Sequence, residues 1–322
     1  MKKIWQLWLA TALATILLTA CGQEEVKPAD TKTPETESQQ EASKFPLTVT
    51  DVTGNEITLE EEPKAIVSMI PSNTEILFAL GLDEEIVGVS DYDNYPEEAA
   101  SKEKIGGVEF NVEKIISLNP DLVLAHQSAL GTWDAGLTQL RDAGIQVYTV
   151  TNAETFDATY ETIEEIGEVT NKSAEATKIV EEMKAKVQVV QDKVQTVESK
   201  KKVLVEVSPE PEIYSPAGNT ITNEMLTMIN AENLVADLEG WIKLDPEEIV
   251  KRNPDVIITT YGAYTPDSTN LVLNRNGFAA VTAVKNKAVV DVDADLTNRM
   301  GPRLADGLET LAKAIYPEVF GE

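Results

Sequence analysis

Two glutamates, Glu113 and Glu247, stand at matching places in two similar segments that are separated by about the length of one domain. The segments run from 111 to 125 and from 245 to 259, align without a gap, and share the sequence Asn-Pro-Asp. Each glutamate falls at the second position of an expected helix, where the helix dipole stabilises a carboxylate by roughly 0.3 to 1 kcal/mol. That stabilisation alone could account for both residues. Alternatively, two equivalent carboxylates, one in each half of the protein, could bind a symmetric partner.

Each segment predicts a capped short helix followed by a buried strand. Asn111 and Asp245 suit the N-cap, and Pro246 suits the first turn, where its missing N–H costs nothing. The proline of Asn-Pro-Asp ends the helix, because its ring disfavours helical geometry in the residue before it. The apolar runs 122–125 and 256–258 are typical of strands covered on both faces of a parallel sheet. The pattern therefore predicts one helix–strand unit used twice.

The single histidine, His126, directly follows the expected strand 122–125. Open parallel sheets bind ligands at the carboxyl ends of their strands, so His126 is expected where a ligand would lie. It either coordinates iron or cobalt as an axial ligand, or it lines a cleft or the surface. Trp133 follows closely, either as a cleft wall or as the first turn of a helix over 135–143.

Tyr92 and Tyr95 lie in a loop after the expected strand 86–90, together with carboxylates. Aromatic faces can cover a macrocycle, and a phenol can reach a metal or a polar rim. Ordinary packing of half-buried tyrosines is the alternative. Ser72 and Glu75 have the spacing of a capping box at the start of another helix, which predicts a structural role for Glu75.

Strands and helices alternate from residue 46 onward, after a hairpin over 47–59, which predicts two α/β lobes over 46–169 and 201–322. Between them, 170–200 is predicted to be a linking helix, because 171–200 contains neither Gly nor Pro. Such a helix would be up to about 45 Å long at 1.5 Å per residue. A stiff connection of this kind predicts a small rocking motion of the lobes.

The first twenty residues are expected to be a signal peptide, because a Lys-Lys start precedes an apolar stretch too short for a dependable membrane span. Leu-Thr-Ala-Cys over 18–21 resembles the lipobox of bacterial lipoproteins, which implies a lipid on Cys21; an uncleaved membrane anchor is the alternative. Cys21 is the single cysteine, so no internal disulfide is possible. Residues 21–45 are polar and proline-rich, which predicts a flexible tether.

The formal charge of −28 excludes nucleic acid and anionic lipid surfaces as favourable partners. Removing residues 1–20 takes away two lysines and no acid, so the mature chain carries −30. One histidine and one lipid-committed cysteine leave no zinc cluster, Cys/His dyad or Ser-His-Asp triad, and phosphate-binding glycine motifs are absent. The chain is therefore not expected to be an enzyme.

The paired segments, with their shared Asn-Pro-Asp, resemble those of the substrate-binding proteins of ABC importers for cobalamin, ferric siderophores and haem. The resemblance covers residues 46–320. It implies an α/β fold of two Rossmann-like lobes with central sheets, joined by one long helix, the class III or cluster A periplasmic-binding architecture. It also implies that Glu113 and Glu247 dock onto arginines of the two permease subunits.

The same resemblance implies a pocket lined by Tyr92, Tyr95, Trp241 and Tyr214, with Tyr92 preferred to Tyr95 and with Trp241 in the pocket rather than in the core. Tyr214 is expected in a loop over 208–214 that follows a strand. Residues 298–303, Asn-Arg-Met-Gly-Pro-Arg, resemble a family motif in which proline replaces Met300. This implies that Arg299 meets an anionic group of the ligand, whereas Arg303 is structural.

These features together predict an extracytoplasmic lipoprotein on the membrane of a Gram-positive cell. We expect it to hold no resident cofactor and to capture a cobalt or iron chelate for an ABC permease dimer and its ATPase subunits. Trp241 and Tyr92 favour cobalamin, with a ferric siderophore or haem as close alternatives. A surface-anchored ligand sensor or a cofactor-processing enzyme on the same fold are the other candidate functions.

Overall fold

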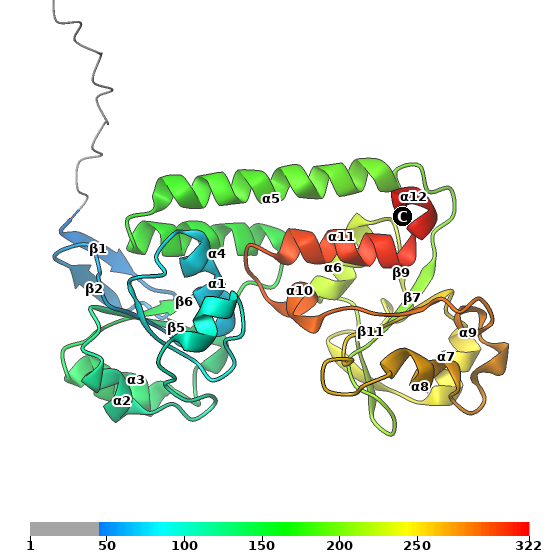
Figure 1. Ribbon diagram of the computed structural model, residues 1–322, viewed down its shortest axis with the longest axis horizontal. Coiled ribbons are helices and arrows are strands. Elements are labelled where there is room, and N and C mark those ends of the chain that lie inside the picture. The colour runs from blue at the N-terminus through cyan, green and yellow to red at the C-terminus, as the bar shows by residue number, and fades with distance from the viewer. Residues whose placement is uncertain (1–44, 322) are drawn as a thin grey trace, which may run out of the picture. The chain divides into compact units, whose positions relative to one another are not determined.

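The computed structural model describes residues 45–321, which fall within one unit of the chain (Figure 1). The predicted signal peptide, most of the predicted tether and the lipid site at Cys21 lie outside the described residues. Two parallel sheets flanked by helices confirm the predicted α/β fold. No helix between residues 45 and 321 is long and apolar enough to cross a membrane.

The first lobe contains a four-stranded parallel sheet in the order β4-β3-β5-β6, preceded by the predicted hairpin of β1 and β2. Its strands are β1 (Leu47–Thr50), β2 (Glu56–Leu59), β3 (Ile66–Ser68), β4 (Ile86–Val89), β5 (Leu122–His126) and β6 (Gln146–Val150). Its helices are α1 (Pro71–Ala79), α2 (Val112–Ser117), α3 (Asp134–Asp142) and α4 (Phe156–Val169), with short 3₁₀ turns η1 (Glu97–Ser101) and η2 (Gln127–Ala129).

The second lobe contains a parallel sheet in the order β12-β11-β7-β9 and a separate antiparallel pair, β8 and β10. Its strands are β7 (Lys202–Glu206), β8 (Ile213–Pro216), β9 (Glu232–Asn233), β10 (Trp241–Leu244), β11 (Val256–Thr259) and β12 (Val289–Asp291). Its helices are α6 (Ile221–Met228), α7 (Pro246–Arg252), α8 (Ser268–Leu273), α9 (Thr282–Lys285), α10 (Ala294–Asn298), α11 (Leu304–Ile315) and α12 (Pro317–Phe320), with the 3₁₀ turn η3 (Phe278–Ala280).

Both sheets are buried on both faces, as the continuous apolar runs predict. In β5, Leu122 and Leu124 belong to one core cluster, whereas Val123 and Ala125 belong to another, because successive side chains point to opposite faces of a sheet. The cluster containing Leu122 also contains residues of α4, α5 and α11 and of the second sheet, so it is shared by the two lobes. The opposite faces are covered by α2 and α3 in the first lobe and by α7 and α8 in the second.

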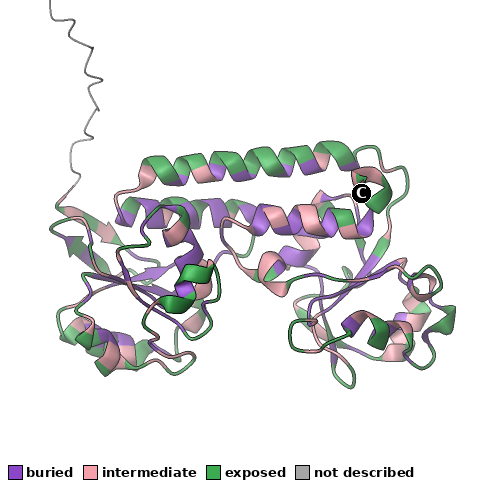
Figure 2. Cartoon of the chain, viewed as in Figure 1, coloured by how far each residue is buried: buried purple, intermediate pink, exposed green. Residues whose placement is uncertain are grey.

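Helix α5 (Ser173–Val194) connects the lobes and packs against both α4 and α11 (Figure 1). Its outer surface is exposed and its inner surface is buried (Figure 2). At 22 residues it spans about 33 Å, so the prediction of a helix over the whole of 170–200 was too long at both ends. At its start Asn171 has a φ of 60°, which is not helical, and beyond its end Thr196 and Val197 are β-branched residues that disfavour helix.

The repeated unit is confirmed in both lobes. Asn119 and Asn253 both adopt left-handed geometry, with φ of 48° and 52°, directly before the proline. The aspartate after that proline then fixes a neighbouring strand: Asp121 Oδ2 accepts hydrogen bonds from the Lys64 and Ala65 amides ahead of β3, and Asp255 Oδ2 accepts one from the amide of Lys202 in β7. Asn-Pro-Asp therefore ends the helix and ties the unit to its sheet.

Two local predictions were wrong. Helix α1 begins at Pro71 and its N-cap is Ile70, so Ser72 and Glu75 lie inside the helix and form no capping box. Proline at the first position fixes a helical φ and so starts the helix ahead of Ser72. Tyr214, expected in a loop, lies in β8 opposite Lys243 of β10.

Candidate functional site

The carboxyl ends of the two sheets are turned toward one another. Asn94, in the loop after β4, donates from Nδ2 to Oδ2 of Asp295, in the segment after β12, at 2.8 Å. Contacts across the lobes therefore join stretches that follow strand ends, where ligands of open α/β sheets bind. We call these stretches the strand-end segments: 69–75, 90–96, 127–133, 151–155, 207–212, 234–240, 260–267 and 292–303.

Glu75 of α1 is the centre of the strongest contact between the lobes. Its side chain is 2% exposed, and its two carboxylate oxygens accept hydrogen bonds from Nε and Nη2 of Arg303 at 2.8 and 2.6 Å. Arg299 Nη1 donates to the same carboxylate at 3.0 Å and to Oδ1 of Asn94 at 2.6 Å, and Arg299 Nη2 pairs with Asp295 at 2.8 Å. Bidentate guanidinium–carboxylate pairs are among the strongest side-chain contacts, so this cluster joins the lobes firmly.

This cluster changes the expectation for Arg299 and agrees with the one for Arg303. Arg299, expected to meet an anionic ligand group, already has protein carboxylates as partners, and Arg303 has the structural role predicted for it. The hydrogen bonds that Arg303 donates to Glu75 raise the pKa of Arg303. The ring of Tyr95 lies 3.7 Å from the Arg303 guanidinium, a cation–π contact, and both residues line a cavity of about 390 Å³.

A second contact between the lobes involves Glu224 of α6. Its Oε2 accepts a hydrogen bond at 3.1 Å from the amide of Phe156, the first residue of α4. Burial raises the pKa of Glu224. Beside it lies a cavity of about 710 Å³, large enough for a sizeable ligand. It is lined by Glu154, Thr155, Gln191, Asn219, Thr220, Asn223, Glu224, Thr227 and Met228.

The predicted aromatic residues leave much of their rings open. Tyr92 is 57% exposed, Tyr214 36% and Trp241 55%, so Trp241 is not a core residue. Tyr264, which the sequence did not single out, is 65% exposed in the strand-end segment after β11, and its hydroxyl donates to the carbonyl of Val207. Its place five residues beyond Thr259, the last residue of β11, was the available signal. Tyr92, Tyr214 and Trp241 line neither the cavity beside Arg303 nor the cavity beside Glu224.

His126 is the last residue of β5 and is 7% exposed, so a surface position is excluded. Burial lowers its pKa to about 4, and the ring is therefore neutral at pH 7. Nδ1 accepts from the amide of Ser128 at 3.2 Å and lies 2.8 Å from its hydroxyl oxygen. Because that lone pair is in use, the neutral ring carries its proton on Nε2. This geometry favours a hydrogen-bond donor over an axial ligand to a metal.

Trp133 is buried directly ahead of α3, and its Nε1 donates to the carbonyl of Val108. Its ring packs edge-on against Phe110 at 5.6 Å. Of the two alternatives, the position at the start of the helix is therefore the one observed.

The second lobe contains a buried ion pair that the sequence analysis did not predict. Glu206, the last residue of β7, pairs with both Nη atoms of Arg275 at 2.6 and 2.8 Å, and the two side chains are 0% and 2% exposed. The hydroxyl of Tyr261 donates to Glu206 at 3.2 Å. A glutamate inside an otherwise apolar strand was the one available signal, since a buried carboxylate needs a partner.

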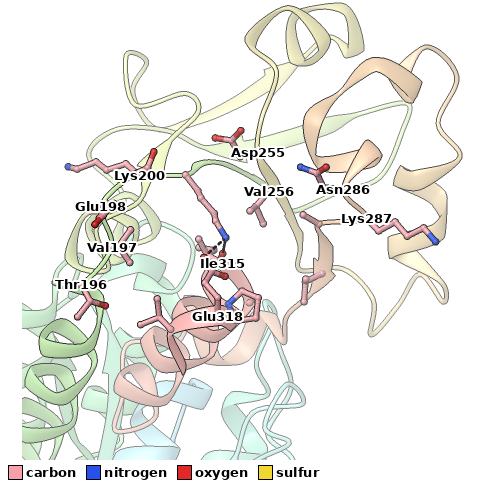
Figure 3. A pocket seen from close by; sticks show the side chains of 17 residues that line it. Thr196, Val197, Glu198, Lys200, Asp255, Val256, Asn286, Lys287, Ile315 and Glu318 are labelled. Atoms are coloured by element: carbon pink, nitrogen blue, oxygen red, sulfur yellow. Dashed lines mark hydrogen bonds and ion pairs between the residues drawn. The ribbon is translucent and has the colours of Figure 1, made fainter. Parts of the chain in front are cut away.

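A further cavity, of about 730 Å³, lies at the opposite, amino ends of the strands of the second lobe (Figure 3). Lys201 is already engaged there, donating to the carbonyl of Ile315 at 2.8 Å and pairing with Glu318 at 3.0 Å. Lys200 and Lys287 extend outward at its two sides (Figure 3). This hollow contains none of the predicted site residues.

Glu113 and Glu247 are both exposed and both lie in the first turn of their helices, α2 and α7. Neither makes an ion pair or a side-chain hydrogen bond within residues 45–321. Both helices cover the sheet face turned away from α5. The duplicated unit thus presents one free carboxylate in each lobe. Over the same residues no group of three or more His, Cys, Asp or Glu side chains is arranged to hold a metal ion.

Residues 66–296 match the family described as periplasmic binding protein. The chain is 44% identical over 324 residues to the ABC transporter substrate-binding lipoprotein YvrC of Bacillus subtilis, with all of both chains covered. It is 29% identical to a cobalamin-binding protein of Halobacterium salinarum, covering 94% of this chain and 84% of the other. A crystal structure of a possible iron-binding periplasmic solute-binding protein from Staphylococcus epidermidis superposes with a TM-score of 0.72 at 38% identity, covering 80% of this chain and all of the other.

Proposed function

The chain belongs to the periplasmic binding protein family and is a substrate-binding protein of an ABC importer; from this premise we propose that it captures a metal chelate, with cobalamin favoured, and delivers it to the permease. Its relative in Bacillus subtilis is a lipoprotein, in accord with a membrane-anchored position outside the cytoplasm. We assign the anchor to a lipid on Cys21 and the membrane to a Gram-positive cell. A diacylglyceryl group on Cys21 would supply two acyl chains, which are enough to hold the protein stably at the bilayer.

The observation that carries the proposal is the matched pair Glu113 and Glu247. Each is exposed, without a partner among the described residues, and fixed at the start of a helix whose orientation the following Asn-Pro-Asp determines. A binding protein that docks on two permease subunits needs one equivalent contact in each lobe. Free carboxylates at equivalent places meet that need, and cations of the permease would complement them.

The exposed aromatic side chains are evidence in favour of a bulky chelate as the cargo. Tyr92, Tyr214 and Trp241 offer open ring faces, and such rings supply large contact area at little cost in conformational entropy. His126 would donate a hydrogen bond rather than coordinate the metal, which suits a chelate whose metal is already saturated. The relative named for cobalamin adds support, while a ferric siderophore or haem remains the alternative cargo.

Charge reversal of the glutamate pair tests the docking role. In cells that depend on the full chain for uptake, we expect Glu113→Arg with Glu247→Arg to abolish uptake of radiolabelled cyanocobalamin while the affinity of the purified chain for it is unchanged. The matched control is Glu164→Arg with Glu181→Arg, two exposed glutamates with the same change of charge on α4 and α5. Unchanged uptake in the Glu113/Glu247 variant, or a loss of stability with normal uptake, would leave only the helix-dipole role.

A further inference from the structure

The strand-end segments contain two cationic side chains, Arg299 and Arg303, both in the stretch after β12. Acidic side chains occur in most of these segments. They are Glu75, Asp91, Asp93, Glu154, Glu210, Glu212, Asp237, Glu239, Asp267, Asp293 and Asp295. Whether the cleft can hold an anionic ligand therefore depends on whether either arginine is available.

Neither arginine is available in the structure. Arg303 gives two hydrogen bonds to Glu75, at 2.8 and 2.6 Å, and stacks on Tyr95. Arg299 divides its donors among Glu75, Asn94 and Asp295. The two guanidinium charges are thus balanced by two carboxylates, and the side chains of the arginines are only 15% and 18% exposed.

Other cations close to these segments are also bound, either by carboxylates or by backbone carbonyls. Lys243 pairs with Glu212 at 2.8 Å, and Lys104 donates to the carbonyls of Ser90 and Asp93 at 3.1 Å. Arg275 is held by Glu206 inside the second lobe. An anionic group that entered between the lobes would therefore meet carboxylates without a free cation to offset them.

We propose that Glu75 sets the charge class of the ligand: by binding both Arg299 and Arg303, it makes the cleft accept a neutral or positively charged metal chelate and reject an anionic one. This inference rests on the proposed function, because it presumes that the cargo is a metal chelate bound between the lobes. Juxtaposed like charges cost several kcal/mol, and that cost falls on the anionic ligand alone. Glu75 also bridges the lobes, but a purely structural bridge would affect all ligands alike.

The test measures the affinity of the full chain in detergent for four coloured probes by equilibrium dialysis. Cyanocobalamin carries no net charge, ferrioxamine is cationic, haem carries two propionates, and a ferric tris-catecholate is strongly anionic. We expect the better of the first two to bind at least about 100-fold more tightly than either anionic probe. We expect Glu75→Gln to reduce that ratio about tenfold or more, because it releases guanidinium charge while preserving side-chain shape.

A second variant covers the case in which Glu75→Gln fails to fold. Asp295→Asn removes one of the two carboxylate partners of Arg299, at a position where the carboxylate is 30% exposed, and we expect it to reduce the ratio in the same direction. Tightest binding of haem or the tris-catecholate by the unmodified chain would overturn the inference and leave the proposed function intact. An unchanged affinity ratio in both variants would show that Glu75 does not set the charge class of the ligand. If none of the four probes binds, the proposed function fails together with the inference.

Discussion

In the second lobe, the buried carboxylate of Glu206 is matched by Arg275 of the same lobe, whereas in the first lobe the buried carboxylate of Glu75 is matched by Arg299 and Arg303, which follow the last strand of the second. The scaffold beneath these pairs is the same, down to the left-handed Asn and the strand-tying Asp of each repeated unit. Duplication thus preserved the helix–strand unit, while the strand ends diverged. The buried carboxylate of Glu75 is therefore balanced by arginines of the other lobe, whereas the buried carboxylate of Glu206 is balanced within its own lobe.

Neutralising Glu206 in the intralobe pair is expected to cause the largest loss of stability. We expect Glu206→Gln to lower the free energy of unfolding by about 3 to 5 kcal/mol, because the buried charge of Arg275 would lose its bidentate partner and keep only the half-exposed Glu210, whose carboxylate lies 3.7 Å from Nε. Urea denaturation measures the loss. The control is the double variant Glu206→Gln with Arg275→Met, which should recover most of the stability lost in the single variant, because no unpaired buried charge remains. A loss below about 1 kcal/mol for the single variant would contradict the assignment of a tightly buried pair.

His126 makes the stability of the first lobe depend on pH. The second lobe contains no histidine and lacks this dependence. Its pKa falls from 6.5 to about 4 on folding, so the unfolded chain binds more protons between those values and stability declines as pH falls from 6.5 to 4. The decline attributable to this group is about 3 kcal/mol, at roughly 1.4 kcal/mol per pKa unit. Urea denaturation at a series of pH values compares the chain with His126→Asn, which should lack this component. Parallel pH profiles for the two proteins would refute it.

The bridge between the lobes should be easier to break than the intralobe pair. In Glu75→Gln we expect a loss of about 1 to 2 kcal/mol, since both guanidinium groups reach solvent and Arg299 keeps Asp295. Amide hydrogen exchange should also become faster in 292–303, the segment that the bridge holds. A stability loss as large as that of Glu206→Gln, or unchanged exchange in 292–303, would mean that the two carboxylates do not differ in the way described.

The N-caps of α2 and α7 differ between the repeated units, and their substitution is expected to have the smallest effect on stability. The Asn111 side chain accepts a hydrogen bond from the Lys114 amide at 2.9 Å, whereas Asp245 makes no such bond. We therefore expect Asn111→Ala to cost about 1 kcal/mol and Asp245→Ala less than about 0.5 kcal/mol. Thermal unfolding of the two variants in parallel gives the comparison. Equal losses would indicate that both caps form in solution.

Local patterns were enough to predict the parts of the molecule that depend on local physics. The apolar runs, the prolines and the N-cap residues located β5, β11, α2 and α7 because burial periodicity and chain geometry decide those elements. The role of Glu75 escaped prediction because its partners lie 224 and 228 residues away, and a spacing that mimicked a capping box offered a closer explanation. Glu206 and Arg275 were missed for the same reason: a glutamate in an apolar strand indicates a buried partner, but local patterns do not identify a partner 69 residues away.

Binding of cyanocobalamin to the full chain in detergent can be measured by equilibrium dialysis with detection of the corrin absorption, and this measurement decides whether the protein carries cobalamin. We expect saturable binding of one equivalent, weakened about 10- to 100-fold by Tyr92→Ala and by Trp241→Ala, the loss expected for anchoring aromatic side chains. Val189→Ala, which truncates an exposed side chain on α5, should bind as the unmodified chain does. Binding that neither aromatic substitution weakens would place the ligand elsewhere, and a complete lack of binding would contradict cobalamin as the cargo.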